Sequence, residues 1–422
     1  MNKEELTVLE EKLNEQYEEA KAKGLKLDMS RGKPAAEQLD MTMPMMDIFN
    51  GNFDMRDEQG VDVRNYGNLE GIVGARRLLG SMLGVDPEHV IVFGTASLSV
   101  MYDTVSRSMT HGVMGSTPWC RLEKVKFLCP APGYDRHFAI TEHFGIEMIT
   151  IPMKEDGPDM DLVEEYVKDP AVKGIWCVPM YTNPLGITYS KEVCERMAKL
   201  SPAADDFRIY WDNAYCVHHL YDDRQDTLPE ILSMCRKNGK EDMVLIFAST
   251  SKISFAGAGI SCIAASLGNL EWVKKSMTIQ IISHDKINQL RHVLYFKDMD
   301  GIRAHMRKHA AIMRPKFELV LDIMERELHG LGIGTWTKPL GGYFISFNTM
   351  DGCAKAVVEK CREAGVTLTG AGATYPYKQD PHDSNIRIAP SYPTLEELKI
   401  TGELFVLCVK LVSVEKLLEN MQ

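Results

Sequence analysis

The middle of the chain alternates short, continuously apolar runs with segments that have apolar residues at helical spacing. The apolar runs predict strands at residues 89–93, 125–129, 147–152, 173–179, 208–212, 243–249 and 261–266. Amphipathic segments such as 99–109 and 191–201 lie between most of them and predict helices. Strands that are apolar on both faces and alternate with helices are typical of a mostly parallel sheet with helices on both sides. We therefore predict an α/β fold whose large domain, residues 66–300, contains a mostly parallel seven-stranded sheet.

The two ends of the chain predict a second, smaller α+β domain. Residues 3–24 have the pattern of an amphipathic helix, and residues 25–70 are irregular, as in a surface loop or an arm laid on a partner subunit. Beyond residue 300 the pattern predicts helices at 302–330, 352–364 and 394–419 and strands at 343–347 and 386–390. We assign residues 301–422 to the smaller domain and expect the helix and arm over residues 1–65 to contribute to it.

Composition narrows the classes of function. The 422 residues include 48 Lys and Arg against 59 Asp and Glu, a formal net charge of −11, which disfavours a general nucleic-acid binder. The 10 cysteines form no CxxC pair and no zinc-finger spacing, so no metal site is expected. The charged N-terminus is unlike a secretory signal, and no run approaches the roughly 20 apolar residues that span a bilayer. We expect a cytoplasmic protein without nucleic-acid or membrane partners.

Small and hydroxyl residues follow the first strand of the predicted sheet. The segment FGTASL places Thr95, Ala96 and Ser97 between a strand and a helix, where backbone N–H groups and the helix dipole attract anions. Tyr134 lies just beyond the next strand, where its ring can stack on a flat ligand. Taken alone, each feature is explained equally well by an ordinary turn or by an aromatic residue that caps the core.

Five more residues stand where they can act on a ligand. Asn183 precedes a proline and is held extended, and Asp212 ends an apolar strand, where its carboxylate needs a cation or a donor. Tyr215 follows three residues later. Lys252 follows another strand end among serine residues, an arrangement suited to an imine-forming nucleophile, and the planar fork of Arg387 suits a carboxylate. In this order, the residues meet the requirements of pyridoxal phosphate.

The chain resembles the fold-type I pyridoxal-phosphate enzymes of aminotransferase class I, and within them the type Ic bacterial aspartate aminotransferases. The resemblance runs from RGKP near the start to RIAPSYP near the end. It is carried by the ordered motifs NYGN, GTASL, PGYDRH, YTNPLG, WDNAY, STSKISFAGAG, GGYF, GATYPY and RIAPSYP. Their joint order is far more specific than any one of them. The resemblance implies a large sheet domain, a smaller α+β domain and a homodimer with shared active sites.

The resemblance also implies how pyridoxal 5′-phosphate is held. Lys252 is implied to form the internal aldimine and to shuttle a proton, while Asp212 keeps the ring nitrogen protonated. Asn183 and Tyr215 are implied to bond the phenolic oxygen, with Tyr134 stacked on the ring. Lys252, Asp212 and Tyr215 are thus the expected catalytic residues. The phosphate is assigned to small and hydroxyl residues and to a tyrosine from the neighbouring subunit, namely Thr95, Ala96, Ser97, Ser249, Ser251 and Tyr66.

One position departs from the family pattern. Many relatives carry an arginine about eight residues after the lysine to neutralise the phosphate, whereas this chain has Ile260 there. Either backbone donors suffice, or another cation replaces the arginine.

Substrate residues follow from the same resemblance. Arg387 is implied to bind the α-carboxylate, Gly32 to line the entrance, and Asn183 to contact the substrate. A second carboxylate on aspartate or glutamate requires a second cation. The candidates are Arg31, Lys33, Lys286 and Arg291, of which Arg31 and Arg291 are preferred, and each is equally well explained as a surface charge.

The sequence therefore predicts a homodimeric aminotransferase that moves the amino group of L-aspartate to 2-oxoglutarate by a ping-pong mechanism. Another amino donor stays open, as does a β-elimination or decarboxylation on the same groups. A regulatory protein that retains only the fold is disfavoured by the joint presence of Lys252, Asp212 and Arg387. A Schiff-base lyase without pyridoxal phosphate leaves Asp212 and the anion-binding turn unexplained.

Overall fold

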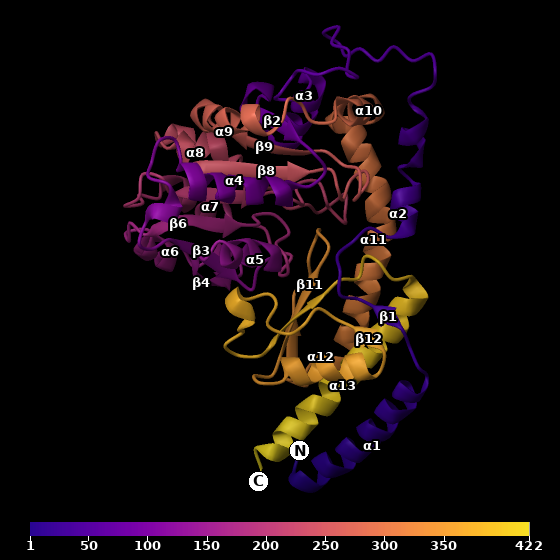
Figure 1. The fold of residues 1–422 in the computed structure, drawn as a ribbon. Helices are drawn as coiled ribbons and strands as arrows, with labels where there is room; N and C mark the ends of the chain where they lie inside the picture. Colours follow the sequence, from indigo (N-terminus) through magenta and orange to yellow (C-terminus); the bar gives the residue numbers. More distant parts are fainter. Residues whose placement is uncertain (422) are drawn as a thin grey trace.

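A computed structural model describes residues 1–421, and Figure 1 shows two bodies of secondary structure joined by one long helix. The larger body contains an eight-stranded sheet in the order β2-β9-β8-β7-β6-β3-β4-β5. The strands are β2 (Val90–Phe93), β3 (Lys126–Ala131), β4 (Glu147–Lys154), β5 (Gly157–Pro158), β6 (Val172–Cys177), β7 (Arg208–Asp212), β8 (Val244–Ser249) and β9 (Ser261–Ala265). Neighbours from β8 through β7, β6 and β3 to β4 are parallel, whereas β9 is antiparallel to both β2 and β8.

The predicted fold class is confirmed, and all seven predicted strands are present. The sequence missed only the eighth, the two-residue strand β5, which pairs antiparallel with the end of β4. A Gly-Pro pair is typical of a turn, so the pattern of side chains did not predict this strand.

The sheet is buried on both faces because alternate side chains enter two different apolar cores. Ile209 and Trp211 of β7 belong to one core, and Tyr210 between them belongs to the other. Helices pack over the sheet as the alternating pattern predicted (Figure 1). They are α3 (Val73–Leu83), α4 (Ser97–His111), α5 (Asp135–His143), α6 (Met160–Tyr166), α7 (Lys191–Lys199), α8 (Ile231–Lys237), α9 (Leu267–Gln280) and α10 (Lys286–Phe296).

The smaller body combines both ends of the chain. Its antiparallel sheet has the order β10-β11-β13, with β10 (Gly334–Trp336), β11 (Ile345–Thr349) and β13 (Asn385–Ile388). Helices α12 (Ala354–Glu363) and α13 (Leu395–Glu419) pack there, and α1 (Lys3–Ala22) lies along α13 (Figure 1). Strand β1 (Leu27–Asp28) pairs in parallel with β12 (Val366–Thr367). These short strands form through contacts distant in sequence, which explains why no local pattern predicted them.

Helix α11 (Met299–Leu328) contributes to both bodies. Its first half places Ile302 and Met306 in a core of the large sheet, and its second half places Phe317 and Val320 in the core of the smaller body. Residues 25–70 first run beside this helix, as far as α2 (Ala36–Asp40), and then pass over the larger body towards α3 (Figure 1). They are mostly irregular, as expected, apart from β1, α2 and a short 3-10 helix, η1 (Met43–Asp47).

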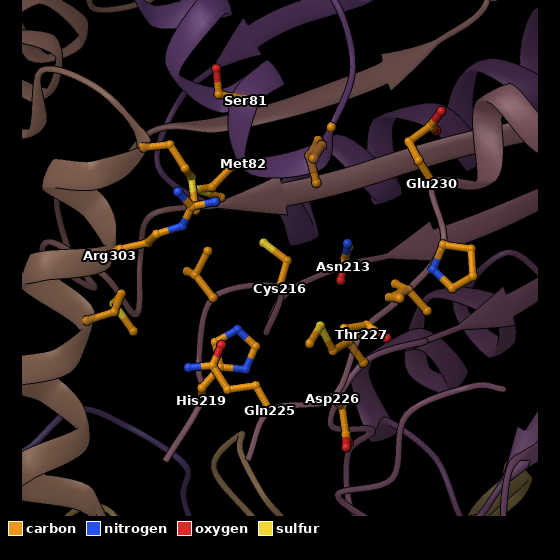
Figure 2. A pocket seen from close by; sticks show the side chains of 18 of the residues that line it. Ser81, Met82, Asn213, Cys216, His219, Gln225, Asp226, Thr227, Glu230 and Arg303 are labelled. Atoms are coloured by element: carbon orange, nitrogen blue, oxygen red, sulfur yellow. The ribbon is translucent and has the colours of Figure 1, made fainter. Parts of the chain in front are cut away.

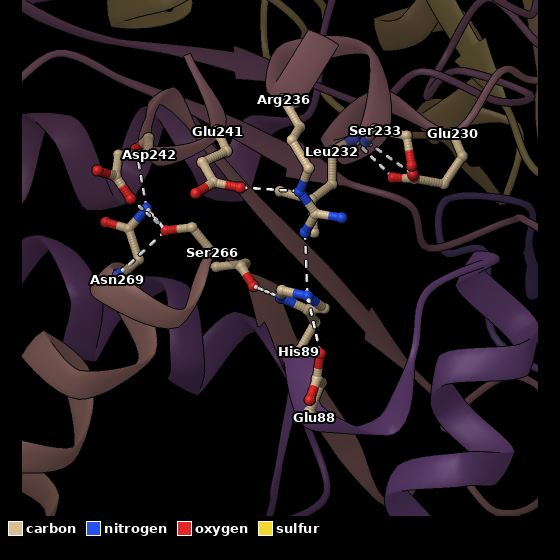
Figure 3. A network of polar contacts seen from close by, with 11 residues as sticks. Glu88, His89, Glu230, Leu232, Ser233, Arg236, Glu241, Asp242, Ser266 and Asn269 are labelled. Carbon is tan, nitrogen blue, oxygen red and sulfur yellow. Dashed lines mark hydrogen bonds and ion pairs between the residues drawn. The ribbon is translucent and has the colours of Figure 1, made fainter. Parts of the chain in front are cut away.

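Figure 3 shows a polar network at the edge of the large sheet opposite the carboxyl ends of its parallel strands. His89, just before β2, donates from Nδ1 to the carbonyl oxygen of Ala265 at 2.8 Å, since a carbonyl only accepts. Its Nε2 therefore accepts from Arg236 at 3.0 Å, and Arg236 also pairs with Glu241 at 2.8 Å. Nearby, Ser266 and Asn269 bond Asp242. This network holds β2, β9 and α8 together far from the strand ends that carry chemistry.

Within residues 1–421, no helix combines the length and the apolar character needed to cross a bilayer.

Candidate functional site

The carboxyl ends of the parallel strands surround a cavity of about 270 Å³. Because β7 ends at Asp212 and β8 at Ser249, these side chains meet at one edge of the sheet, as ligand sites in open α/β folds do. Most of the residues proposed from the sequence line this cavity, namely Gly32, Ala96, Ser97, Tyr134, Asn183, Asp212, Tyr215, Ser249, Ser251 and Lys252. Lys33 lines it as well. Thr95 directly precedes the lining residue Ala96.

Lys252 lies three residues beyond β8. Its ammonium is 5.2 Å from the ring centre of Tyr215 and 5.9 Å from that of Tyr343. Burial lowers the pKa of Lys252; the Asp212 carboxylate opposes this shift, and Arg387 adds to it. The lysine is thus surrounded by aromatic rings in a setting that favours its neutral, nucleophilic amine.

Asp212 is buried with one oxygen satisfied and one free. Oδ2 accepts a hydrogen bond from Nε2 of His137 at 2.9 Å, and the His137 ring stacks on Trp176 with 4.4 Å between ring centres. Oδ1 has no partner among residues 1–421, although Asp212 is only 3% exposed. A buried, unpaired carboxylate oxygen is costly, so the site lacks one N–H or O–H donor at this point.

His137 is a residue that the sequence analysis missed. It lies inside the quoted motif PGYDRH, on the first turn of α5, and its bond to Asp212 orients the carboxylate. The available signal was its three-residue spacing from Tyr134, which places both side chains on one face of the helix. Their rings are indeed 4.9 Å apart.

Arg387 comes from β13 of the smaller body and lies beside the cavity, where it contacts the lining residue Asn183. Its guanidinium pairs with Asp135 at 2.9 Å and donates to Asn183 Oδ1 at 3.3 Å and Thr369 Oγ1 at 3.3 Å. It also lies 4.9 Å above the ring of Phe344. Arg387 is 8% exposed, and its Nε has no partner within the described chain. A buried guanidinium with a donor to spare suits a small carboxylate.

The packing of Phe344 against Arg387 leaves room only for a glycine at position 32. A Cβ atom at this position would lie 2.4 Å from the ring of Phe344, which itself supports Arg387. The glycine therefore lets the N-terminal segment approach the cavity more closely than any side chain would allow.

Hydroxyl groups and a helix N-terminus meet at the far end of the cavity. The hydroxyls of Ser249 and Ser251 are 2.6 Å apart, and α4 begins at Ser97 with no side-chain cap on its N-terminus. The buried phenols of Tyr134 and Tyr215 have raised pKa values, mainly because of burial, and stay protonated as donors. This end of the cavity suits a phosphate group.

Ile260 is part of the core rather than of the cavity. Its side chain is 1% exposed and belongs to a large apolar core, and its backbone N–H donates to Thr250 Oγ1 at 3.0 Å. Position 260 therefore supplies no cation, and an arginine there would disrupt the packing.

Six residues named from the sequence lie outside the cavity lining in this single chain, namely Thr95, Arg387, Tyr66, Arg31, Arg291 and Lys286. Tyr66 is 77% exposed, and Arg31 is exposed on the N-terminal segment. Arg291 bonds Asn288 Oδ1 at 2.5 Å and Met46 Sδ at 3.3 Å. Lys286 is buried and donates to the carbonyl oxygens of Asn65 and Gly67 at 2.5 and 2.6 Å, which anchors the loop next to Tyr66.

A second, larger cavity of about 610 Å³ lies on the other side of the segment that follows β7. Figure 2 shows Asn213, Cys216 and His219 pointing into it, with Arg303 on one wall and Glu230 on another. It contains no lysine and shares no lining residue with the Lys252 cavity. We therefore place the functional site at the smaller cavity.

Three buried histidines predict a specific dependence of stability on pH. Burial lowers the pKa of His218 to about 3, of His309 to about 3 and of His292 to about 4. In the unfolded chain their pKa is about 6.5, so below that pH the unfolded state binds more protons and is favoured. Between pH 7 and pH 5.5, each is expected to lower the free energy of unfolding by about 1 kcal/mol.

Urea unfolding of the wild type and of His309→Gln at both pH values tests this expectation. The variant is expected to lose about 1 kcal/mol less than the wild type between pH 7 and pH 5.5. Equal losses in the two proteins would mean that His309 is not held neutral in the folded state.

The sheet is parallel from β8 to β4, with β9 and β5 antiparallel to their neighbours, and a lysine follows β8; both features are those expected of a fold-type I aminotransferase. A family model described as aspartate amino-transferase matches residues 1–421. The chain belongs to the aspartate aminotransferase family.

Individual relatives agree with this assignment. The aspartate aminotransferase of Corynebacterium glutamicum is 46% identical over 413 residues, which cover 98% of this chain and 95% of that protein. A putative aminotransferase of Mycolicibacterium smegmatis is 45% identical over 99% of this chain and 98% of its own. The crystal structure of an aspartate transaminase from C. glutamicum superposes with a TM-score of 0.96 at 45% identity, over 99% of this chain and 98% of that one.

Proposed function

We propose that the protein transfers the amino group of L-aspartate to 2-oxoglutarate with pyridoxal 5′-phosphate bound at Lys252. The observation that carries this proposal is the free, buried Oδ1 of Asp212 in the same cavity as Lys252, whose pKa is lowered. The aspartate donor is supported by the C. glutamicum relative, which is named an aspartate aminotransferase.

The residues present fit this cofactor. The N–H donor that Asp212 Oδ1 lacks would come from a protonated pyridine nitrogen, and the α4 N-terminus with Ser249 and Ser251 would hold the phosphate. When bound, pyridoxal phosphate supplies an aldehyde that condenses with amines and a ring that withdraws electrons. Asn183 and Tyr215 line the cavity and are the donors we assign to the phenolic oxygen, with Tyr134 stacked on the ring.

Three residues of the chain have separate roles in the proposed reaction. Arg387 binds the α-carboxylate of the amino acid and so fixes the direction of the Cα–H bond. The amine of Lys252, whose pKa is lowered by burial, takes the proton from Cα and returns it to the carbon of the former aldehyde group. The carboxylate of Asp212, oriented by His137, stabilises positive charge on the ring nitrogen. The same groups then act in reverse on the keto acid, which makes the reaction ping-pong.

Mixing purified enzyme with L-aspartate alone tests the proposal. One equivalent of oxaloacetate is expected per site, with conversion of the bound cofactor to pyridoxamine 5′-phosphate, measured by absorbance and by chromatography of the released cofactor. Added 2-oxoglutarate should reverse the conversion and yield glutamate. Release of ammonia with pyruvate, or of carbon dioxide, would instead establish a lyase or a decarboxylase.

Replacing Arg387 with lysine is expected to raise KM for every amino donor to a similar extent. The variant loses two-point binding of the α-carboxylate, worth about 1.5–3 kcal/mol, or about 10- to 100-fold in KM. Steady-state kinetics with aspartate, glutamate and alanine measure this. A loss confined to aspartate and glutamate would make Arg387 the binder of the distal carboxylate.

Lys33 is our candidate for the distal carboxylate of aspartate. It lines the cavity, and its ammonium lies 3.7 Å above the ring of Tyr392, which holds it at the rim. Lys33→Ala is expected to raise KM for aspartate about tenfold and to leave alanine unchanged. Arg136, whose charge lowers the pKa of Tyr134 against the larger effect of burial, is the variant to compare. A selective loss in Arg136→Ala alone would move the assignment to that residue.

We also propose a homodimer. Large apolar side chains are exposed along η1, the end of α9 and α10, namely Met43, Met46, Ile279, Ile282, Ile287 and Leu294, and η1 contacts α10. The exposed Tyr66 is the residue we expect to reach the partner's phosphate. Hybrid dimers of Lys252→Ala and Tyr66→Ala subunits are then expected to regain one native site. Inactive hybrids, or a monomer in sedimentation, would reject this arrangement.

A further inference from the structure

A buried chain of polar contacts connects the loop that carries Lys252 with the N-terminal segment. The carbonyl oxygen of Ile253 lies 2.9 Å from Nε2 of His305, which lies 3.1 Å from Nε2 of His309. Nδ1 of His309 lies 2.9 Å from the amide nitrogen of Gln38. His305, His309 and Gln38 are 4%, 3% and 0% exposed, so water does not compete for these contacts.

Gln38 sets the direction of hydrogen bonding at one end. Its carbonyl oxygen accepts from the backbone N–H of Ala35 at 2.9 Å, so its amide group donates to His309 and lies 3.1 Å from the hydroxyl of Tyr343. A neutral His309 that accepts at Nδ1 has its proton on Nε2 and donates it to His305. Nε2 of His305 must then accept, and it cannot also donate to the carbonyl oxygen of Ile253.

This row of hydrogen bonds therefore has two arrangements of protons. In each arrangement the backbone group at only one end, Ile253 or Ala35, has its hydrogen bond. In the first, Ala35 is bonded to Gln38, and the carbonyl oxygen of Ile253 lacks a donor from His305. In the second, His305 donates to Ile253 and His309 donates from Nδ1, which requires the Gln38 amide to turn over and release the N–H of Ala35. The two ends of the chain are thus coupled through a two-state element.

Both ends matter to the site. Ile253 follows Lys252 directly, and the carbonyl oxygen of Lys252 itself lies 3.3 Å from Nε2 of His218. At the other end, Ala35 follows Gly32, Lys33 and Pro34, which line the cavity. When His305 donates to the carbonyl oxygen of Ile253 in the lysine loop, the hydrogen bond from Ala35 to Gln38 at the cavity rim is therefore lost.

We propose that His305 and His309 are positioning residues that couple the loop of Lys252 to the cavity rim at residues 32–35. The proposal rests on the role assigned to Lys252 in the proposed function. Neither histidine lines the cavity, so both act through the peptide that follows the lysine rather than on substrate. Substrate that settles on the rim thereby changes how firmly the lysine loop is held.

The test measures the amine of Lys252 directly in the cofactor-free, full-length protein. Acetylation by acetic anhydride from about pH 6 to pH 10, quantified at Lys252 by mass spectrometry, gives its apparent pKa. His309→Leu removes the ring that donates to His305, so His305 can donate to the carbonyl oxygen of Ile253 in every molecule and hold the lysine loop in its buried position. Because burial lowers the pKa of Lys252, that pKa is then expected to fall by about 0.5–1 unit, so that labelling at a fixed pH rises about 3- to 10-fold.

A change in the pKa of Lys252 can be attributed to His309 only if the other groups around Lys252 are the same in the variant. Asp212, Arg387 and His218 are the charged or titratable groups nearest to it, together with the phenols of Tyr215 and Tyr343. None is replaced by the substitution, and the pKa of His218, about 3, is lowered mainly by burial and only secondarily by His309. The conservative variant His309→Gln, which retains one donor and one acceptor, is expected to restore most of the wild-type profile and replaces His309→Leu if that variant does not fold.

His89→Gln is the matched control, since it also removes a buried neutral histidine but at the opposite edge of the sheet. It is expected to lower the melting temperature without moving the Lys252 profile. If His309→Leu and His309→Gln behave like this control, the histidines are merely structural and the proposal is wrong. The labelling needs no turnover, so a wild type that does not act on aspartate would reject the proposed function while leaving this result standing.

Discussion

Lys252→Ala is expected to lower kcat for transamination by about 10⁴-fold or more, the largest effect of any single substitution in this protein. The lysine supplies both the amine that holds the cofactor and the base that moves the proton at Cα, and alanine does neither. Its ammonium lies among aromatic rings at the cavity rather than in the packed core, so the fold should survive. Stopped assays of oxaloacetate formation, with circular dichroism as a check on folding, provide the measurement.

Added methylamine offers an internal control for this variant. A free amine that diffuses into the vacated space is expected to restore part of the proton transfer, as it would not if the substitution had damaged the fold. Transamination by Lys252→Ala at a rate close to that of the wild type would contradict the assignment of Lys252.

Asp212→Asn is expected to reduce kcat by about 10²- to 10³-fold and to weaken retention of the cofactor. Removing one partner of a buried charge pair costs about 3–5 kcal/mol, and the amide no longer stabilises a protonated ring nitrogen. The loss should appear both in steady-state kinetics and in the fraction of cofactor that remains after dialysis.

The control for Asp212 is Asp206→Asn. Asp206 is also buried and ionically paired, with Lys173 at 2.6 Å, but it lies before β7 rather than at its carboxyl end. This variant should lose stability and retain both cofactor and kcat per folded site. Unchanged cofactor binding in Asp212→Asn would show that the ring nitrogen lies elsewhere.

Most of the sheet was predictable because its strands are local patterns. Runs such as RIYWD and VLIFAS are apolar on both faces, and this is visible in a few residues without knowledge of the rest of the chain. Strands β1 and β12 were missed because two residues carry no pattern, and their pairing depends on contact between segments far apart in sequence.

In the site, too, residues with a local sequence pattern were predictable and residues that depend on long-range contacts were not. Asp212 and Lys252 could be proposed because one ends a strand and the other follows one at the side of the sheet where ligands bind, and the structure places both at one cavity. His137 was within a quoted motif but unrecognised, because its partner Asp212 is 75 residues away. His305 and His309 resemble core residues of an amphipathic helix, and only the contact with Gln38, 271 residues from His309, reveals a chain. Tyr66 and Arg31 stay predictions, since one chain does not test a residue that acts across an interface.

The packing of α1 against α13 has a consequence for synthesis of the protein. Tyr17 donates to the carbonyl oxygen of Lys360 across 343 residues, and α13 begins only at Leu395. Helix α1 is synthesised first, but its apolar face, which includes Leu6 and Leu13, is covered only after α13 has been synthesised. The larger sheet can fold while the chain is still growing, but the smaller body cannot. Throughout translation, the nascent N-terminus thus presents an uncovered amphipathic helix, the form of segment that chaperones bind.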